Sequence, residues 1–165
     1  MYDNRGKRDI LIFPKFNNID KIQEIRNKYD KLATLIPPHI TLVFPFNSEM
    51  TNEELIDNLS TLLKDFSPFN VTFKGISLSN DNYIFLNCIK GSNEIIKLHD
   101  KLYEKILPTY FNKTINYIPH ITLGQTNNLN RIQNFNYEFN AIINEITIEL
   151  IGENEESIII KNIKL

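Results

Sequence analysis

The sequence Pro-His-Ile-Thr-Leu occurs twice in this chain of 165 residues, at positions 38–42 and again at 119–123. Identity over five positions at two places in so short a chain is expected by chance in roughly one sequence in a hundred or fewer, so we interpret it as an internal repeat. The copies lie about half the chain apart and contain two of the three histidines. The repeat predicts two similar half-units, each contributing one His-x-Thr sequence to a shared site.

The first copy is predicted to lie on a β-strand, because it alternates in polarity and follows two prolines. Side chains on a strand alternate between its two faces. His39 and Thr41 should therefore share one face, while Ile40, Leu42 and Phe44 pack into the core on the other.

The second copy predicts the same arrangement, with His120 and Thr122 on one face. Gly124 comes next along that face, where we expect it to leave room in the site. Residues two apart on a strand are about 6.5 Å from each other, a separation that a phosphoryl group can bridge. If the two strands face each other, they bring together two imidazoles and two hydroxyls.

The rest of the chain predicts alternating strands and helices. We expect strands at 8–13, 39–46, 69–79, 82–90, 120–126, 139–152 and 156–165, and helices at 17–36, 50–66 and 92–107. This pattern predicts an α+β fold with two similar lobes. No linker rich in proline, glycine or serine separates the halves, so we expect residues 1–165 to form a single domain of two closely packed lobes.

Local signals predict where several of these elements begin or turn. Asn18 and Ser92 can cap the first and third helices, and Thr51 with Glu54 forms a capping-box sequence for the second. Residues 80–82, Asn-Asp-Asn, tolerate left-handed backbone and predict a hairpin turn.

Composition excludes several classes of function. The chain is 42% hydrophobic and 23% charged, with a net charge of −2, so it lacks the basic excess of a non-specific nucleic-acid binder. The apolar run at 10–13 is too short for a signal peptide or membrane span, which predicts a cytoplasmic protein. Cys88 is the only cysteine, so we expect it to be a buried strand residue.

A pair of histidines suits phosphodiester cleavage. The reaction needs a base for the attacking oxygen and an acid for the leaving oxygen, and an ordinary histidine pKa near 6.5 allows both forms at one pH. Two histidines alone leave a zinc ion short of ligands, so we expect no metal. The chain also lacks a Gly-x-Ser-x-Gly sequence and a phosphate-binding Gly-x-x-x-x-Gly-Lys loop. His99, among charged residues on a predicted helix, should be solvated.

The two His-x-Thr sequences resemble the 2H phosphoesterase superfamily, which includes 2′-5′ RNA ligase-like proteins and cyclic phosphodiesterases. The segments "KYDKLATLIPPHITLVFPF" and "YIPHITLGQ" are particularly similar to a small bacterial branch. The resemblance implies that His39 and His120 are the acid–base pair and that Thr41 and Thr122 bind phosphate. It also implies two pseudo-symmetric lobes of mostly antiparallel sheet, helices outside, a central cleft and no cofactor. Several relatives have arginine where this chain has Ile118.

The sequence constrains the substrate less than it constrains the four residues of the two motifs. Four aromatic residues near the motifs could stack a base, namely Phe13, Tyr83, Phe85 and Tyr117. Lys15 and Arg131 could reach a terminal phosphate, although a solvated position is expected for both. We expect a monomer acting on RNA ends or small nucleotides, by opening 2′,3′-cyclic phosphates or cleaving 2′-5′ linkages. The alternatives are hydrolysis of cyclic or oligoadenylate signalling nucleotides and non-catalytic binding of RNA ends.

Overall fold

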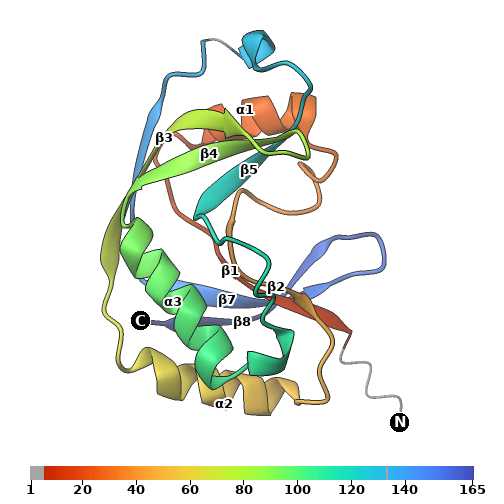
Figure 1. The fold of residues 1–165 in the computed structure, drawn as a ribbon. Helices are drawn as coiled ribbons and strands as arrows, with labels where there is room; N and C mark the ends of the chain where they lie inside the picture. Colours follow the sequence, from red (N-terminus) through yellow and green to blue (C-terminus); the bar gives the residue numbers. More distant parts are fainter. Residues whose placement is uncertain (1–5, 133) are drawn as a thin grey trace.

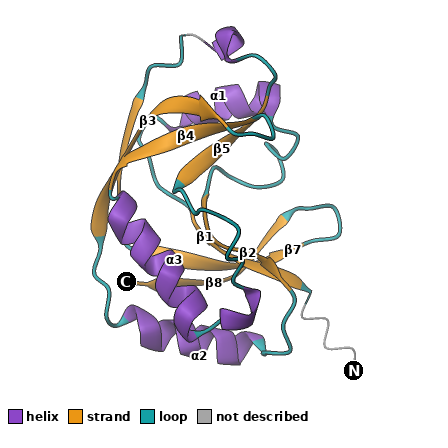
Figure 2. Ribbon diagram, in the orientation of Figure 1, coloured by secondary structure: helices purple, strands orange, loops and turns teal. Residues whose placement is uncertain are grey.

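The computed structural model describes residues 6–132 and 134–165 and contains two four-stranded antiparallel sheets (Figures 1 and 2). The first sheet has the order β2-β1-β7-β8 and the second has the order β5-β4-β3-β6. The strands are β1 (Lys7–Ile12), β2 (Ile40–Phe46), β3 (Phe69–Leu78), β4 (Tyr83–Lys90), β5 (His120–Gln125), β6 (Glu138–Ile143), β7 (Glu145–Ile151) and β8 (Ser157–Lys164). The helices are α1 (Ile19–Tyr29), α2 (Asn52–Leu63) and α3 (Ser92–Lys105), with short 3-10 turns η1 (Pro108–Tyr110) and η2 (Leu129–Ile132).

The first sheet forms one lobe with α2 and α3, and the second sheet forms the other lobe with α1. These lobes do not correspond to the two halves of the sequence. In the first lobe, α2 contacts β8 and α3 contacts β2; in the second lobe, α1 contacts β5. Figure 1 shows α1 beside β4 and β5 at one end, with α2 and α3 at the other. Each helix that precedes a motif copy in the sequence therefore packs on the sheet that carries the other copy. The predicted α+β, two-lobed fold is confirmed, with its helices exchanged between the lobes.

Apolar stripes on the helices and sheets form one contiguous core. Leu59 of α2 and Leu98 of α3 are fully buried with Ile10 in the first lobe, and Phe73 and Ile84 are equally buried in the second. Each such side chain contributes about 1.5–3 kcal/mol when it is removed from water. This shared burial packs the lobes against each other.

Two of the predictions made from local sequence are confirmed, one at the start of α2 and one in the β3–β4 turn. The Thr51 hydroxyl accepts a hydrogen bond from the Glu54 amide at 3.1 Å, and the Glu54 carboxylate accepts one from the Thr51 amide at 2.7 Å. The predicted capping box of α2 is thus confirmed. Asn82 has a φ of 64° in the β3–β4 turn, which confirms the left-handed backbone predicted there.

Of the other two predicted caps, one is correct in position and one is wrong. Asn18 is the N-cap residue of α1, but its side chain makes no capping hydrogen bond, and its side-chain amide donates to the carbonyl of Glu138 at 3.1 Å. Ser92 is the first residue of α3, and Gly91 before it has a left-handed φ of 84°. The first helix also ends at Tyr29 rather than at residue 36, because the following residue adopts an extended backbone.

The strand predicted at 139–152 is two strands in different sheets. The chain leaves β6, which pairs with β3, and after Asn144 enters β7, which pairs with β1. Apolar residues continue through this junction, so their periodicity gives no sign of the change of sheet. Among the described residues, none of the helices has the length and apolarity to cross a membrane.

Bulges in both motif strands change which side chains face the core. Thr41 pairs with Leu11, but Val43 pairs with Ile10, so β2 contains one extra residue there, and a second lies between the pairings of Val43 and Phe46. As a result Val43 is buried, and Phe44, predicted to be in the core, is 37% exposed.

Gly124 also lies elsewhere than predicted. β5 has an irregularity between its pairings with Phe85 and Ile84, and Gly124 packs against the backbone of Tyr29 at the end of α1. A Cβ at this position would overlap the Tyr29 carbonyl group. The glycine therefore permits the close approach of α1 to β5, and the prediction that it leaves room in the site was wrong.

Candidate two-histidine active site

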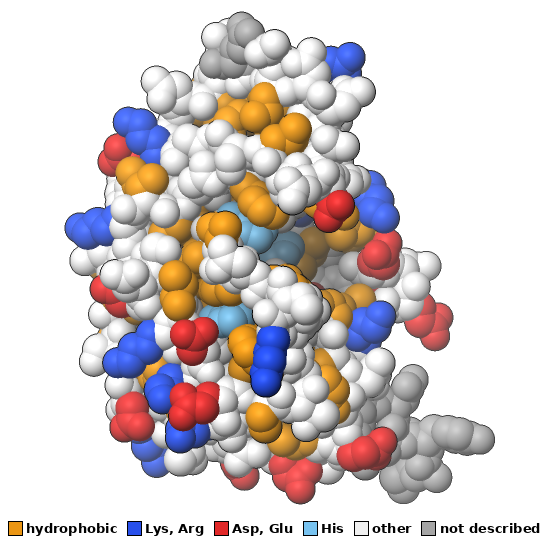
Figure 3. All heavy atoms as spheres, viewed as in Figure 1, with side chains coloured by type: hydrophobic (Ala, Val, Ile, Leu, Met, Phe, Trp, Pro, Cys, Tyr) orange, Lys and Arg blue, Asp and Glu red, His pale blue; other side chains and the backbone are white. Residues whose placement is uncertain are grey.

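The two copies of the repeated sequence meet where the lobes face each other. β2 and β5 are terminal strands of their sheets, and they contact each other across the interface. His39 immediately precedes β2, and His120 begins β5. Figure 3 shows histidine side chains in a hollow of this face, surrounded by hydrophobic side chains. The structure thus brings the two predicted histidines to one place.

Both imidazole rings are oriented by the same backbone contact. Nδ1 of His39 lies 2.8 Å from the carbonyl oxygen of Pro37, and Nδ1 of His120 lies 2.6 Å from that of Ile118. A carbonyl oxygen only accepts, so Nδ1 carries the proton in each ring. Nε2 of each neutral ring is therefore left with a lone pair to accept a proton.

Burial lowers the pKa of both histidines. The pKa of His39 falls to about 4, mainly because burial disfavours the charged ring, with smaller contributions from the Arg26 guanidinium and from His120. Burial also lowers the pKa of His120. Both rings are thus neutral near pH 7 in the unliganded protein.

Each histidine has one of the predicted aromatic residues as a neighbour. Phe13 approaches His39 edge-on, with ring centroids 6.2 Å apart. Phe85 stacks on His120 with centroids 3.6 Å apart and an angle of 22° between the rings. Phe85 pairs with Thr122 across β4 and β5, so its position follows from the sheet register.

A cavity of about 300 Å³ lies beside the second motif. Its walls are formed by Phe44, Tyr83, Phe85, Ile115, Asn116, Tyr117, Ile118, His120 and Thr122. Three of the four predicted stacking residues line it, whereas Phe13, His39 and Thr41 do not. Phe44 was missed because the β2 bulge cannot be detected from alternation of polarity. In the part of the chain that the structure describes, no charged side chain lines this cavity.

His99 is buried, so the prediction that it is solvated was wrong. Only 4% of it is exposed, and its ring lies parallel to that of Tyr117 at 3.7 Å, with 8° between the planes. Its Nδ1 is 2.9 Å from the carboxylate of Asp100. Helical spacing places His99 on the same face of α3 as Ile95 and Leu102, which are buried. This periodicity predicts a buried His99 more reliably than the charged residues next to it in sequence predict a solvated one.

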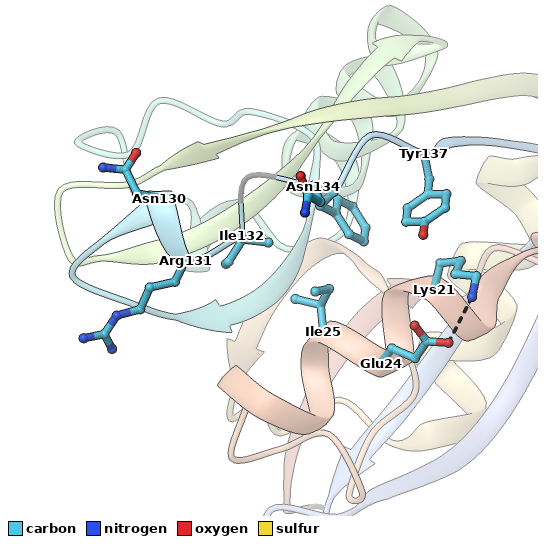
Figure 4. Close-up of a pocket in the computed structure, with 9 residues that line it drawn as sticks. Lys21, Glu24, Ile25, Asn130, Arg131, Ile132, Asn134 and Tyr137 are labelled. Atoms are coloured by element: carbon cyan, nitrogen blue, oxygen red, sulfur yellow. Dashed lines mark hydrogen bonds and ion pairs between the residues drawn. The ribbon is translucent and has the colours of Figure 1, made fainter.

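Lys15 and Arg131, which the sequence suggested could reach a terminal phosphate, lie away from this cavity. The Lys15 side chain is 81% exposed and 3.9 Å from the Glu145 carboxylate. Arg131 lines a separate cavity of about 310 Å³ with residues of α1, including Lys21. Figure 4 shows Arg131 pointing away from the centre of that cavity and Lys21 bonded to Glu24. Both cations are therefore placed as surface residues.

Cys88 lies in a strand, as predicted, but it is half-buried rather than buried. Its thiol donates to the carbonyl of Lys90 at 3.1 Å. Burial raises the pKa of this thiol to about 11, which keeps it protonated.

Two sheets that each present one His-x-Thr sequence at a shared interface are the arrangement of the two-histidine, or 2H, phosphoesterase class. The model of the 2′-5′ RNA ligase superfamily matches residues 14–148, and the chain belongs to this family. The chain is 33% identical over 124 residues to a protein of Oceanobacillus iheyensis named "Putative phosphoesterase", with 72% of this chain and 70% of that protein covered. These matches confirm the family resemblance inferred from the motifs.

Solved structures share the fold. Escherichia coli LigT complexed with 3′-AMP has a TM-score of 0.64 and 16% identity, covering 97% of this chain and 98% of LigT. LigT has also been solved with NADP⁺ and with ATP, with TM-scores of 0.66 and 0.61 to this chain. The protein TT0787 of Thermus thermophilus has a TM-score of 0.66 and 13% identity, covering 96% and 97% of the two chains.

Proposed function

We propose that this 2H phosphoesterase family member is a metal-independent phosphodiesterase acting on RNA ends or small nucleotides. In the proposal His39 and His120 transfer the protons, and Thr41 and Thr122 bind the phosphate. The observation that carries it is the matched pair of Nδ1-to-carbonyl contacts, which gives two facing strands one Nε2 acceptor each. Recognition alone needs donors, whereas two oriented titrating rings suit proton transfer.

The chemistry requires the two rings to differ in protonation. One neutral imidazole accepts at Nε2 the proton of the attacking water or hydroxyl while the new P–O bond forms. The other, as imidazolium, donates its Nε2 proton to the oxygen whose bond to phosphorus breaks. Since both rings are neutral in the free protein, the acid gains its proton as the anionic phosphate binds and favours the charged ring.

The threonine hydroxyls complete the proposed site. Each can donate a hydrogen bond to a non-bridging phosphate oxygen, and these bonds strengthen as negative charge develops in the transition state. Thr122 lines the cavity, and Thr41 is half-buried opposite Leu11. Either histidine can take either role in this scheme.

The cavity supports a nucleotide as the substrate. Tyr83 and Phe44 on its walls are 41% and 37% exposed, so their surfaces are available to a ligand. Stacking of a base on an aromatic ring contributes about 1–3 kcal/mol. The LigT complexes with 3′-AMP, NADP⁺ and ATP also support a small nucleotide ligand. We propose 2′,3′-cyclic phosphate opening or 2′-5′ cleavage, by a cytoplasmic monomer.

The test is turnover of a defined set of substrates. The purified chain would be incubated, with and without EDTA, with 2′,3′-cyclic mononucleotides, 2′-5′ dinucleotides and cyclic or oligoadenylate signalling nucleotides. Turnover that resists EDTA and is abolished by His39→Ala and by His120→Ala is expected. Absence of turnover, with nucleotide binding unchanged in both variants, would favour a non-catalytic binding module. Thermal melts of each variant would establish that it is folded.

A further inference from the structure

Two tyrosine hydroxyls bind the outer edge of β2. β2 is the terminal strand of its sheet, so one of its edges pairs with none of the other strands that the structure describes. The amide of Phe44 donates to the hydroxyl of Tyr103 at 3.1 Å, and the hydroxyl of Tyr117 donates to the carbonyl of Thr41 at 2.8 Å. These bonds satisfy backbone groups that burial would otherwise leave unpaired.

The two bonds differ in what they connect. Tyr103 belongs to α3, which packs on β2 in the same lobe, so its bond fastens the strand to its own covering helix. Tyr117 lies in the segment that leads into β5, directly before Ile118, whose carbonyl orients His120. The Tyr117 bond therefore joins the first motif strand to the residues that position the second histidine.

Tyr117 is itself held rigidly. Its ring is stacked on the buried ring of His99, and His99 also makes edge-to-face contacts with Tyr103 and Phe111. Burial raises the pKa of Tyr117, so the hydroxyl remains a proton donor across the working pH range. The bond to Thr41 thus comes from a side chain with little freedom to move.

We propose that Tyr117 is a positioning residue that fixes the separation of the two histidine motifs through its hydrogen bond to the Thr41 carbonyl. The kinetic part of this inference rests on the proposed phosphodiesterase function, while the structural part does not. The attacking and leaving oxygens lie on opposite sides of the phosphorus, so the separation of the histidines decides whether both can exchange protons with them. A displacement of about 1 Å at reacting groups can reduce the rate about 100-fold.

The experiment compares Tyr117→Phe with Tyr103→Phe. Each variant removes one hydroxyl from the same aromatic cluster and one hydrogen bond from the same strand edge, so similar losses of melting temperature are expected. For Tyr117→Phe we expect kcat to fall by about 10- to 100-fold with KM nearly unchanged. For Tyr103→Phe we expect kcat within about twofold of the unmodified protein, because the bond it removes does not span the motifs.

A second readout is independent of turnover. NMR titration of the histidine ring protons should show changed midpoints for His39 and His120 in Tyr117→Phe and unchanged midpoints in Tyr103→Phe. His99→Leu, which removes the stacking partner and leaves the Tyr117 hydroxyl, should give the pattern of Tyr117→Phe with smaller amplitude. This readout tests the positioning role even if the unmodified protein turns over none of the substrates, a result that would count against the proposed function alone.

Two outcomes would overturn the proposal. Unchanged kcat and histidine midpoints in both Tyr117→Phe and His99→Leu would show that the bond does not set the geometry. Equal losses of kcat in Tyr117→Phe and Tyr103→Phe would show a general loosening of β2 rather than control of the distance between motifs.

Discussion

The two copies of Pro-His-Ile-Thr-Leu are identical in sequence and differ in what surrounds them. Both histidines have the same Nδ1-to-carbonyl contact, because that contact is made to the residue two positions before each histidine. The neighbours of the rings come from elsewhere: His39 has Phe13 edge-on and a buried Arg26 nearby, whereas His120 is covered by the face of Phe85. The backbone just before each copy, at Pro37 and Ile118, thus orients both rings alike, while segments distant in sequence give the two rings different neighbours.

Arg26 illustrates how the exchanged helices create this difference. It is 1% exposed on α1 and bonds to the carboxylate of Asp30 at 2.9 Å. It also donates to Gln23 and to the carbonyl of Leu32, within the segment that leads to His39. A helix of the second lobe therefore places a cation near the histidine of the first lobe.

The largest effects should come from the histidines themselves, and they test whether the two copies are functionally equal. We expect His39→Ala and His120→Ala each to lower kcat/KM by about 10²–10⁴-fold, the usual contribution of a single proton transfer. Because the rings act as a unit, the double variant should lose little more than the worse single variant. Steady-state kinetics on the best cyclic or 2′-5′ substrate would measure this. Retention of activity by one single variant would show that the copies are not equivalent partners.

The threonines should show the next largest effects. We expect Thr41→Val and Thr122→Val to lower kcat/KM by about 10²–10³-fold, the range for removing one donor to a developing oxyanion. Thr→Ser at either position keeps the hydroxyl and should retain most of the activity. Thr114→Val, at an exposed position, is a matched control that should leave kcat unchanged. Equal activity of the valine and serine variants would exclude a phosphate-binding role for the hydroxyl.

A buried carboxylate pair distinguishes the first-lobe sheet. Asp9 and Glu149 are cross-strand partners on β1 and β7, only 6% and 2% exposed, and the Ser157 hydroxyl donates to Glu149. Asp9 lies on the same face of the sheet as Leu11, the partner of Thr41. Burial, followed by the nearby Glu149 charge, raises the pKa of Asp9 from 3.8 to about 8. One proton is therefore retained by the pair at neutral pH.

This pair predicts a loss of stability with rising pH. The folded state keeps the Asp9 proton up to about pH 8, whereas the unfolded chain loses it near 3.8, so the contribution is complete below pH 3.8 and lost as pH rises to 8. Urea unfolding should show a decline of at most about 1.4 kcal/mol per pH unit in this window. Asp9→Asn should remove this part of the slope, and Asp81→Asn in the exposed β3–β4 turn should not. An unchanged slope in Asp9→Asn would show that Asp9 is already ionised.

The sequence predicted the parts of this molecule that depend on local pattern. The motif strands, the Thr51 capping box and the Asn82 turn each follow from residues adjacent in sequence. The family also followed from the two motifs, because their spacing and identity are specific. For the site, the sequence predicted that His39 and His120 come together, and it named three of the aromatic residues in the cavity wall.

What the sequence missed depends on contacts between distant segments. Periodicity shows which face of α1 is apolar but not that this face packs on β5, the strand of the other motif. Polarity shows that Phe44 alternates with its neighbours, but the bulge that turns it into the cavity is set by pairing with β1. His99 has charged neighbours in sequence, while its ring is enclosed by Tyr117, Tyr103 and Phe111 from the fold.

The smallest expected effect is a difference between the two histidines in how they make the unfolding free energy depend on pH. His39 has a folded pKa of about 4, below its ordinary 6.5, so between these values the unfolded chain binds a proton that the folded protein does not. Stability should therefore fall as pH decreases from 6.5 to 4, at no more than about 1.4 kcal/mol per unit from this residue. His39→Asn should flatten the slope of urea-unfolding free energy between about pH 6.5 and 4.5, since asparagine does not titrate. His120→Asn should flatten it less, because burial, the main cause of both shifts, lowers the pKa of His39 further, and at His39 the Arg26 charge adds to this against the opposing charge of Asp30. If the two variants changed the slope equally, the surroundings of the copies would not set their proton affinities, and the contrast between identical motifs would be one of packing alone.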